Sequence, residues 1–283
     1  MSEYLLGAAQ IRKLATELQI SPTKKLGQNF VIDPNTVRRI VEIADVTPSD
    51  VVVEIGPGLG SLTLGLLPQA QEVIAIEIDS RLANQLPKTI ETHASAQASK
   101  LKVINQDALQ VSELPSRPNK LVANLPYNIS VPVLLHFLEL FPSISHVLVM
   151  VQAEVGERLA AKPGSRIYGI PSIKAQFYAD TKIAAQISRQ IFWPVPNVDS
   201  VLVSLIRRNQ SIDPKLRTEL FAIVDSAFSQ RRKTLRSALV SYFGDTNKVE
   251  QVLAQAKIDS KLRGEQLGLE NFLLIAKTAM EVK

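Results

Sequence analysis

Four consecutive residues, Asn124-Leu125-Pro126-Tyr127, combine groups that could hold a flat ligand carrying an exocyclic amine. The asparagine side-chain oxygen and a backbone carbonyl can accept the two N–H bonds of such an amine, and Pro126 adds a carbonyl with no competing N–H. The tyrosine ring can stack on the face of a planar base. Taken alone, the same four residues also fit a tight turn, because asparagine and proline are common turn residues.

The apolar segment before the motif, Leu121-Val122-Ala123, predicts a buried strand, so the motif begins where that strand ends. A second segment, Val51–Ile55, is rich in β-branched residues and predicts another buried strand, which leads into a glycine-rich loop and then a helix over 61–67. In an open α/β sheet, ligands bind at the carboxyl ends of the strands. We therefore expect a ligand site at this edge of the sheet.

The glycine-rich loop at 56–60 has the strand–loop–helix context of a nucleotide-type cofactor site, in which glycine lets the backbone approach the ligand closely. Its spacing is G-x-G-x-G rather than the G-x-G-x-x-G of dinucleotide sites, with Ser61 at the position of the third glycine. Pro57 also removes an N–H that could bind a pyrophosphate. These differences argue against NAD and FAD and favour a ligand without phosphate, such as S-adenosylmethionine.

Two acidic residues are associated with the next two predicted strands. Glu77 lies near the end of the strand predicted over 73–79, 21 residues after Gly56, and a carboxylate at that distance can accept the ribose hydroxyls of an adenosine group. Asp107 follows a strand predicted over 101–105 and could accept the adenine amine of the same cofactor. An acid at a strand end can instead form a cap, and an aspartate in a loop does not by itself identify a ligand contact.

The alternation of strands and helices predicts a doubly wound α/β sheet of about seven strands. The predicted strands cover 51–55, 73–79, 101–105, 121–123, 146–151, 182–187 and 201–206. Residues 209–283 show helical patterns without strands, which predicts a small all-helical domain. We therefore expect an N-terminal extension with helical spacing over 1–20, a sheet domain over 21–207 and a helical domain over 208–283.

The composition excludes several kinds of site. The chain of 283 residues has no cysteine, which excludes disulfides, thiolate metal sites and cysteine nucleophiles, and its three histidines show no metal-ligand spacing, so no metal is expected. No apolar segment approaches the roughly 18 residues that would suggest a membrane span, and the first 20 residues lack the apolar core of a signal peptide. We expect a cytoplasmic protein without a membrane partner.

Positive charge is concentrated in the C-terminal part of the chain. Residues 1–200 contain 18 Lys/Arg and 18 Asp/Glu, whereas residues 201–283 contain 14 Lys/Arg and 9 Asp/Glu. This excess fits a nucleic-acid partner, although a solvated face is the alternative. Two clusters are candidates for phosphate contact: Lys24 and Lys25 in a predicted loop, and Arg231, Arg232, Lys233 and Arg236 at the start of a helix predicted over 231–242.

Five motifs follow one another along the chain: Gly27-Gln28-Asn29-Phe30, Glu54-Ile55-Gly56-Pro57-Gly58-Leu59-Gly60, Asn124-Leu125-Pro126-Tyr127-Asn128-Ile129-Ser130, Phe192-x-Pro194-x-Pro196-x-Val198-Asp199-Ser200 and Phe228-Ser229-Gln230-Arg231-Arg232-Lys233-Thr234-Leu235-Arg236. Together, over about residues 21–283, they resemble the small-subunit (16S) ribosomal RNA adenine dimethyltransferases, the kasugamycin-sensitivity dimethyladenosine transferases. The last motif resembles this family more than the erythromycin-resistance methyltransferases of large-subunit RNA.

The resemblance implies a class I S-adenosylmethionine-dependent methyltransferase domain over 21–207 and an RNA-docking helical domain over 208–283, acting as a monomer. The implied reaction is dimethylation of the exocyclic amines of two adjacent adenosines in a hairpin near the 3′ end of 16S rRNA. The implied partner is the small (30S) ribosomal subunit or its precursor, during ribosome biogenesis.

The resemblance also implies roles for individual residues. The cofactor would be bound by Asn29, Val31, Gly56, Gly58, Glu77, Ile78, Asp107, Ala108 and Asn124. The target adenine would be held by Asn124, Leu125, Pro126 and Tyr127, with Phe192 stacked on its other face. The RNA would be bound by Lys24, Lys25, Arg231, Arg232, Lys233 and Arg236. Leu26, Val31 and Trp193 depart from the residues frequent in the family, which leaves the residues that form the rim of the pocket unassigned.

Other functions fit parts of the sequence. A related enzyme could methylate a single adenine of large-subunit RNA, and an assembly factor could bind immature small subunits without turnover. The intact Glu77 and the motif at 124–127 argue against the assembly factor. A small-molecule methyltransferase would need neither the basic helical domain nor the proline-rich loop at 191–200.

Overall fold

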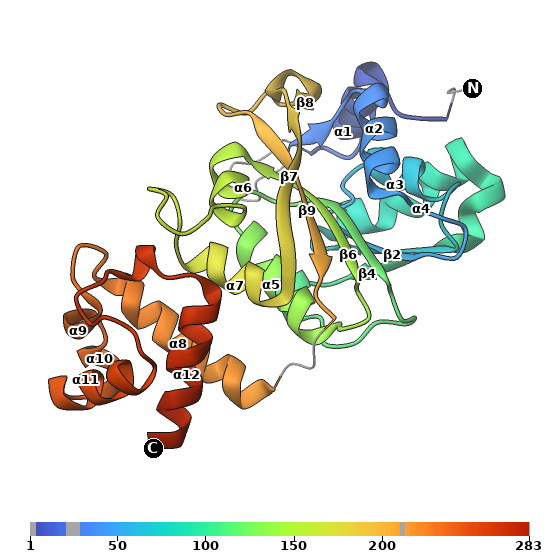
Figure 1. The fold of residues 1–283 in the computed structure, drawn as a ribbon. Coiled ribbons are helices and arrows are strands. Elements are labelled where there is room, and N and C mark those ends of the chain that lie inside the picture. The colour runs from blue at the N-terminus through green and yellow to red at the C-terminus, as the bar shows by residue number, and fades with distance from the viewer. Residues whose placement is uncertain (1–3, 21–28, 210–212, 283) are drawn as a thin grey trace. The chain divides into compact units, whose positions relative to one another are not determined.

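The computed structural model describes residues 4–20, 29–209 and 213–282 (Figure 1), and these form two compact units. The first unit contains the residues up to 156 together with 182–207. The second contains 157–181 together with the residues from 208 onward, so it begins earlier in the chain than the boundary expected at 207/208. None of the helices in the described ranges is long and apolar enough to cross a membrane.

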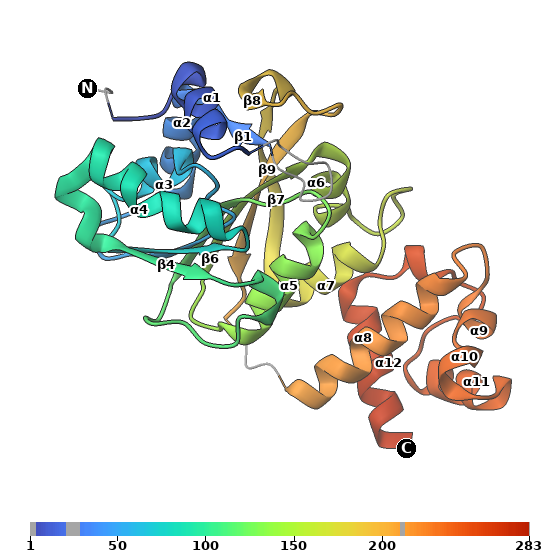
Figure 2. The ribbon, with the colours of Figure 1, turned by 180° about the vertical axis from the view of Figure 1, so that it is seen from behind.

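A seven-stranded sheet confirms the predicted doubly wound architecture (Figures 1 and 2). Its strand order is β4 (Leu101–Asn105), β3 (Glu72–Glu77), β2 (Val51–Ile55), β5 (Lys120–Asn124), β6 (His146–Gln152), β9 (Ser200–Arg207), β7 (Ala179–Ile187). The pairs from β4 to β6 are parallel, and β9 is antiparallel to β6. Parallel strands are covered on both faces, which explains why Val53, Ile74 and Leu121 are completely buried.

The order of the strands places a topological switch point between β2 and β5. From β2 the chain moves outward through β3 to β4, and from β5 it moves outward in the other direction to β6. The glycine-rich loop follows β2 and the motif at 124–127 follows β5. A crevice forms at such a point because the two connections leave the sheet on opposite sides.

Helices cover the sheet on both sides (Figures 1 and 2). They are α2 (Pro34–Ala44), α3 (Ser61–Leu66), α4 (Ser80–Ala94), α5 (Ser130–Leu140) and α6 (Ala153–Leu159). Helix α2 begins at Pro34 because the Asp33 carboxylate caps it, accepting hydrogen bonds from the backbone N–H groups of Asn35 and Thr36.

The N-terminal extension is part of the core of the first unit. Its helix α1 (Ala8–Glu17) buries Ile11 and Ala15, and the residues before it bury Leu5 and Leu6 in the same apolar cluster. The guanidinium of Arg81 donates to the carbonyl of Gln19 at 3.4 Å. Residues 4–20 are therefore a packed element and not a separate appendage.

A two-stranded antiparallel sheet joins the segment at 30–31 to the proline-rich loop. Strand β1 (Phe30–Val31) pairs with β8 (Phe192–Trp193), with Phe30 opposite Trp193 and Val31 opposite Phe192. The Phe30 and Trp193 rings are stacked with their centroids 6.3 Å apart. This pairing connects the segment that begins at residue 29 to the proline-rich loop.

The second unit is helical, as predicted for its C-terminal part. Its helices are α7 (Ile170–Tyr178), α8 (Pro214–Ser229), α9 (Leu235–Ala238), α10 (Val240–Phe243), α11 (Thr246–Gln255) and α12 (Leu269–Val282). The prediction of one helix over 231–242 is wrong, because 231–233 form a turn and two short helices follow. The backbone N–H groups of Leu235 and Arg236 bind the carbonyls of Leu262 and Ser260, so this segment is held by a neighbouring loop.

Candidate active site

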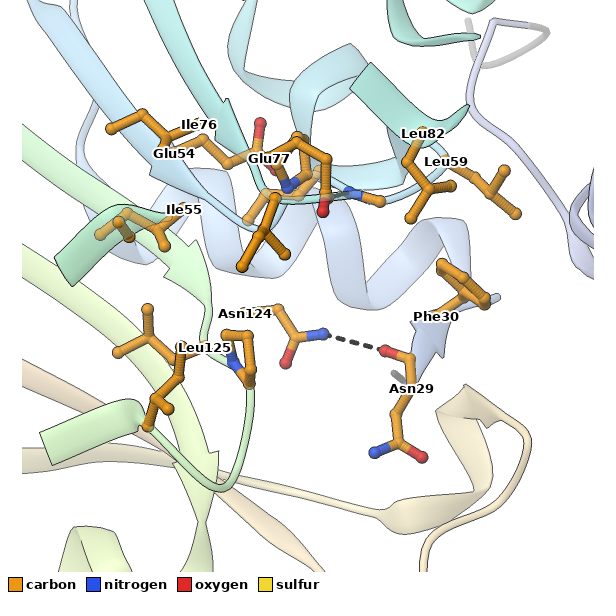
Figure 3. A pocket seen from close by; sticks show the side chains of 18 of the residues that line it. Asn29, Phe30, Glu54, Ile55, Leu59, Ile76, Glu77, Leu82, Asn124 and Leu125 are labelled. Carbon is orange, nitrogen blue, oxygen red and sulfur yellow. Dashed lines mark hydrogen bonds between the residues drawn. The ribbon is translucent and has the colours of Figure 1, made fainter. Parts of the chain in front are cut away.

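A cavity lies at the carboxyl ends of β2, β3, β4 and β5 (Figure 3). It contains about 920 Å³ of space between atoms, part of it open to solvent. The structure brings together at this cavity all of the expected cofactor residues, which are Asn29, Val31, Gly56, Gly58, Glu77, Ile78, Asp107, Ala108 and Asn124. Leu125, Pro126 and Tyr127 also line it. A concave site lined by apolar side chains with a few polar groups is typical of small-molecule binding.

The glycine-rich loop has a backbone conformation that side chains disfavour. Gly56, Gly58 and Gly60 have φ values of 69°, 58° and 95°. A Cβ atom at Gly58 would stand 3.0 Å from the ring of Phe30, which also lines the cavity. Glycine at 58 therefore lets the loop turn while its N–H donates to the carboxylate of Glu77.

We predict that Gly58→Ala weakens binding of the adenosine-type cofactor by about tenfold or more, because the loop and Phe30 must both shift. The matched control is Gly164→Ala, since Gly164 also has a positive φ, of 82°, but a Cβ atom there meets nothing within 4 Å. Both variants should lose about 1–2 kcal/mol of stability from backbone strain. Equal cofactor affinity in the two variants, measured by calorimetry, would show that the loop at Gly58 does not shape the site.

Glu77 is fixed at the end of β3 by the backbone on both sides of its carboxylate. Its Oε2 accepts from the Gly58 N–H at 3.1 Å and its Oε1 accepts from the Asp79 N–H at 3.0 Å. Burial raises the pKa of Glu77, while these N–H groups oppose the increase. Because each carboxylate oxygen can accept more than one hydrogen bond, both oxygens keep capacity for a pair of ligand hydroxyls.

Asn124 presents an unused acceptor to the cavity (Figure 3). Its Nδ2 donates to the carbonyl oxygen of Asn29 at 3.1 Å, which fixes the orientation of the amide. Its Oδ1 is buried and has no hydrogen-bond partner among the residues that the structure describes. A buried acceptor without a partner costs about 1–3 kcal/mol. The arrangement therefore suits a ligand that brings an N–H donor to this oxygen.

Tyr127 is held by a residue that was not predicted to belong to the site. Its hydroxyl lies 2.8 Å from the hydroxyl of Ser200, a completely buried residue at the start of β9. Burial raises the pKa of Tyr127, so the phenol stays protonated near neutral pH. The only sequence signal for Ser200 is its place at the end of the motif that begins at Phe192.

Phe192 is not brought to the cavity with Tyr127. Its side chain is completely buried and does not line the cavity, because β8 pairs with β1 and places Phe192 opposite Val31. The half-buried Trp193, next in the chain, stacks on Phe30 instead. A stacking role for Phe192 therefore stays a prediction that requires its ring to become accessible.

The cavity also has walls formed by residues that were not predicted to belong to the site. Phe30, Leu59, Leu62, Leu82 and Ile129 supply apolar surface. Glu54 is an acid inside the otherwise apolar β2, and such an acid in a buried strand is a sequence signal for a functional group. In the described ranges of the chain, no group of three or more acidic or histidine side chains could hold a metal ion.

The basic residues expected to bind RNA differ in whether the structure describes them and in what their side chains contact. Lys24 and Lys25 lie outside the described residues. Arg231 binds within the second unit: its Nε pairs with Glu265 at 3.1 Å, and its Nη2 donates to the carbonyl oxygens of Arg166 and, at 3.2 Å, Tyr168.

The remaining cations of this cluster are on the surface. Arg236 pairs with Glu250 at 2.7 Å, and both side chains are about half exposed. Arg232 and Lys233 are exposed in the turn before α9. The cluster therefore contains one cation with a clear structural role and at least two that face solvent.

Comparison with known proteins identifies relatives along nearly the whole chain. A sequence model of the family "Ribosomal RNA adenine dimethylase" matches residues 21–281. A protein of Thermobifida fusca named ribosomal RNA small subunit methyltransferase A is 58% identical over 274 residues, which is 96% of each chain. Its namesake in Streptomyces avermitilis is 57% identical over 277 residues, 97% of this chain and 94% of the relative.

Two solved structures share the fold. A dimethyladenosine transferase from Plasmodium falciparum has a TM-score of 0.73 and 27% identity, with 86% of this chain and 94% of that chain covered. The 23S rRNA methyltransferase ErmE has a TM-score of 0.67 and 25% identity, with 89% of this chain and 100% of that chain covered.

Proposed function

Because the chain belongs to the ribosomal RNA adenine dimethylase family, we propose that it dimethylates the exocyclic amines of two adjacent adenosines near the 3′ end of 16S rRNA. The methyl donor is S-adenosylmethionine, and the substrate is the small ribosomal subunit or its precursor during ribosome biogenesis. The protein acts in the cytoplasm as a monomer. The curated relatives named for the small subunit, at 57–58% identity, support this choice of RNA.

The observation that carries the proposal is the unpaired Oδ1 of Asn124. This oxygen is buried, lies at the cavity and has its orientation fixed by the Nδ2 bond to Asn29. An exocyclic adenine amine has two N–H donors, of which Oδ1 accepts one and the Leu125 carbonyl accepts the other. Accepting both bonds favours a tetrahedral nitrogen and frees its lone pair, which is otherwise delocalised into the ring.

The chain contributes mainly positioning to the reaction. When bound, S-adenosylmethionine supplies a methyl group activated by a sulfonium centre. Among the residues that line the cavity, Glu77 would orient the ribose, the glycine-rich loop and Asn29 would form the walls of the site, and Asp107 would accept from the adenine of the cofactor. Tyr127 holds the flipped base by stacking, worth about 1–3 kcal/mol per base. No strong base is needed, because the alkylated ammonium is acidic and loses its proton readily.

The helical C-terminal region binds the RNA through phosphate contacts, which is supported by its excess of Lys and Arg. We predict that the double variant Arg232→Gln/Lys233→Gln lowers the salt dependence of binding to unmethylated small subunits, by about one in the log–log slope for each lost contact. Filter binding at several salt concentrations measures this slope.

The control is Arg231→Gln, which removes one positive charge from the same turn. Since Arg231 binds Glu265 and the carbonyl of Tyr168, its loss should lower thermal stability and leave the slope at the wild-type value. A double variant with an unchanged slope, in a folded protein, would contradict phosphate contact at Arg232 and Lys233.

One alternative has structural support, because ErmE, a 23S rRNA methyltransferase, has the same fold at 25% identity. Small and large subunits from a strain lacking the corresponding modification should be incubated separately with the enzyme and methyl-labelled cofactor. Label in the small subunit alone supports the proposed substrate. Label in the large subunit alone would replace it with the large-subunit alternative.

A further inference from the structure

Ser200 is a buried polar residue to which the proposed mechanism gives no role. It is completely buried at the start of β9, and the residues that follow it, Val201, Leu202 and Val203, are buried apolar side chains. Burying a hydroxyl in such surroundings costs free energy unless the hydroxyl forms a hydrogen bond. Within the described part of the chain, its hydroxyl has one such partner, the hydroxyl of Tyr127 at 2.8 Å.

The Ser200 hydroxyl is held in a fixed position by the backbone around it. Ser200 lies opposite Gln152 in the antiparallel pair of β9 with β6. The carbonyl of the preceding residue, Asp199, accepts from the backbone N–H of Ala153 at 3.0 Å. The carboxylate of Asp199 accepts from the backbone N–H of Arg189 at 2.9 Å. The end of the proline-rich loop is therefore anchored on β6, on the start of α6 and on the segment that precedes the loop, so the serine is the rigid member of its pair.

Tyr127, by contrast, lies in the loop between β5 and α5. It is half-buried and lines the cavity, and this loop closes with a hydrogen bond from the Ile129 N–H to the Pro126 carbonyl at 3.2 Å. The hydroxyl of a tyrosine stands at the far end of its ring, so a hydrogen bond there fixes the direction of the ring axis. Without it, the side chain could adopt other staggered orientations. Ser200 thus determines where the Tyr127 ring stands in the cavity wall.

Another buried tyrosine shows that the fold does not supply a partner to every phenol. Tyr168 is completely buried in the second unit, and its hydroxyl has no hydrogen-bond partner among the described residues. Tyr127 is less buried, yet the hydroxyl of a completely buried serine is placed against its own. Satisfying a buried phenol is therefore not a sufficient reason for a serine at position 200.

We propose that Ser200 is a positioning residue of the base site: its hydroxyl holds the Tyr127 ring in the place where the flipped adenine stacks on it. This inference rests on the proposed function, because it concerns the tyrosine that would hold the target base. A ring that is fixed before the RNA arrives need not be ordered when the base stacks, and the target amine is then better placed for attack. Ser200 acts through Tyr127, so its effect is on the rate of methyl transfer and not on the binding of the cofactor.

A double-mutant cycle on single-turnover methyl transfer tests the proposal. The full-length variants Ser200→Ala, Tyr127→Phe and their combination are compared with the wild type, at saturating unmethylated small subunits and labelled S-adenosylmethionine. Each single substitution removes the same hydrogen bond and keeps the ring, so each should lower the rate by about 3- to 10-fold. The combined variant should be no slower than the slower single variant, whereas independent effects would multiply to about 10- to 100-fold.

Two substitutions of the same kind in the second unit are the matched controls. Ser172→Ala removes a completely buried serine hydroxyl that bonds to the Gly169 N–H and the Arg158 carbonyl. Tyr168→Phe removes the phenol hydroxyl that has no described partner. Both variants should transfer methyl groups at the wild-type rate, although Ser172→Ala should be less stable. Cofactor affinity, measured by calorimetry, should keep its wild-type value in the controls and in the cycle, because every variant keeps the Tyr127 ring or its phenylalanine equivalent.

Different failures have different meanings. A wild-type rate in folded Ser200→Ala or Tyr127→Phe, single losses that multiply in the combined variant, or an equal loss in Ser172→Ala would each overturn the role of Ser200. If Ser200→Ala does not fold, Ser200→Cys takes its place in the cycle, because a thiol nearly keeps the size of the side chain but forms only weak hydrogen bonds. Absence of methyl transfer by the folded wild type would instead contradict the proposed function, and the inference would fall with it.

Discussion

Replacing Asn124 with alanine is expected to lower kcat for methyl transfer by about 100- to 1,000-fold, the usual cost of removing one fixed polar group from a reacting centre. The variant loses Oδ1, the buried acceptor that has no other described partner, and with it the force that turns the amine towards tetrahedral geometry. It also loses the Nδ2 bond to Asn29, so cofactor affinity should fall, but by much less than kcat. Single-turnover assays separate the two effects.

The control for this variant is Asn128→Ala, which removes an exposed asparagine from the same loop. Its kcat should stay within a few-fold of the wild type. RNA affinity should be unchanged in both variants, because neither side chain belongs to the basic cluster. A wild-type kcat in Asn124→Ala would exclude activation of the amine by Oδ1. The motif at 124–127 would then be explained by its alternative interpretation, a tight turn.

The second large effect is expected at Glu77. Glutamine has one oxygen, so in Glu77→Gln an amide NH₂ must face the backbone N–H of either Gly58 or Asp79, where the carboxylate now accepts from both. The substitution also leaves one oxygen to accept from two ribose hydroxyls. We expect cofactor affinity to fall by about 100-fold, from lost hydrogen bonds to a charged group and an unsatisfied donor.

Glu72→Gln makes the same chemical change at the opposite end of β3. Glu72 pairs with Lys102 at 2.7 Å, away from the cavity, so cofactor affinity should be preserved. Calorimetric titration of both variants with S-adenosylhomocysteine, which cannot transfer a methyl group, provides the comparison. Equal affinities for the two variants would mean that Glu77 supports the fold alone and does not bind the ribose.

The parts of the fold that the sequence predicted are those whose pattern is local. Parallel strands are buried on both faces, so β2, β3 and β5 appear as short runs of apolar residues. Each of them ends at or beside a residue that was expected to bind a ligand. Position at a strand end was enough to place Glu77, Asp107 and Asn124 around one cavity, because the carboxyl ends of parallel strands share one edge.

The features that were missed depend on contacts between distant segments. The pairing of β1 with β8 joins residues about 160 positions apart, and neither segment has a strand pattern of its own. That pairing buries Phe192, which the motif alone presents as a base-stacking ring. The helix that follows the turn at 231–233 is likewise held by a separate loop, because the N–H groups of Leu235 and Arg236 donate to the carbonyls of Leu262 and Ser260, where a local pattern predicts a continuous helix.

The sequence predicts how many charged residues each region contains, but not which of their side chains make contacts within the protein. Arg231 and Arg232 are equivalent in sequence, yet Arg231 is tied to Glu265 and two carbonyls while Arg232 is exposed. The same holds for acids: Glu54 belongs to a recognised motif, but only the structure reveals that it faces the cavity with a single hydroxyl partner.

The most direct test of the central claim is nucleoside analysis of small ribosomal subunits from a strain that lacks the modification, after incubation with the enzyme and tritiated S-adenosylmethionine. We predict that the label is recovered as N6,N6-dimethyladenosine at two residues of each small subunit, and that Asn124→Ala abolishes it. Absence of label despite tight binding to the subunits would contradict the account, because a protein with this cavity would then bind its target without acting on it.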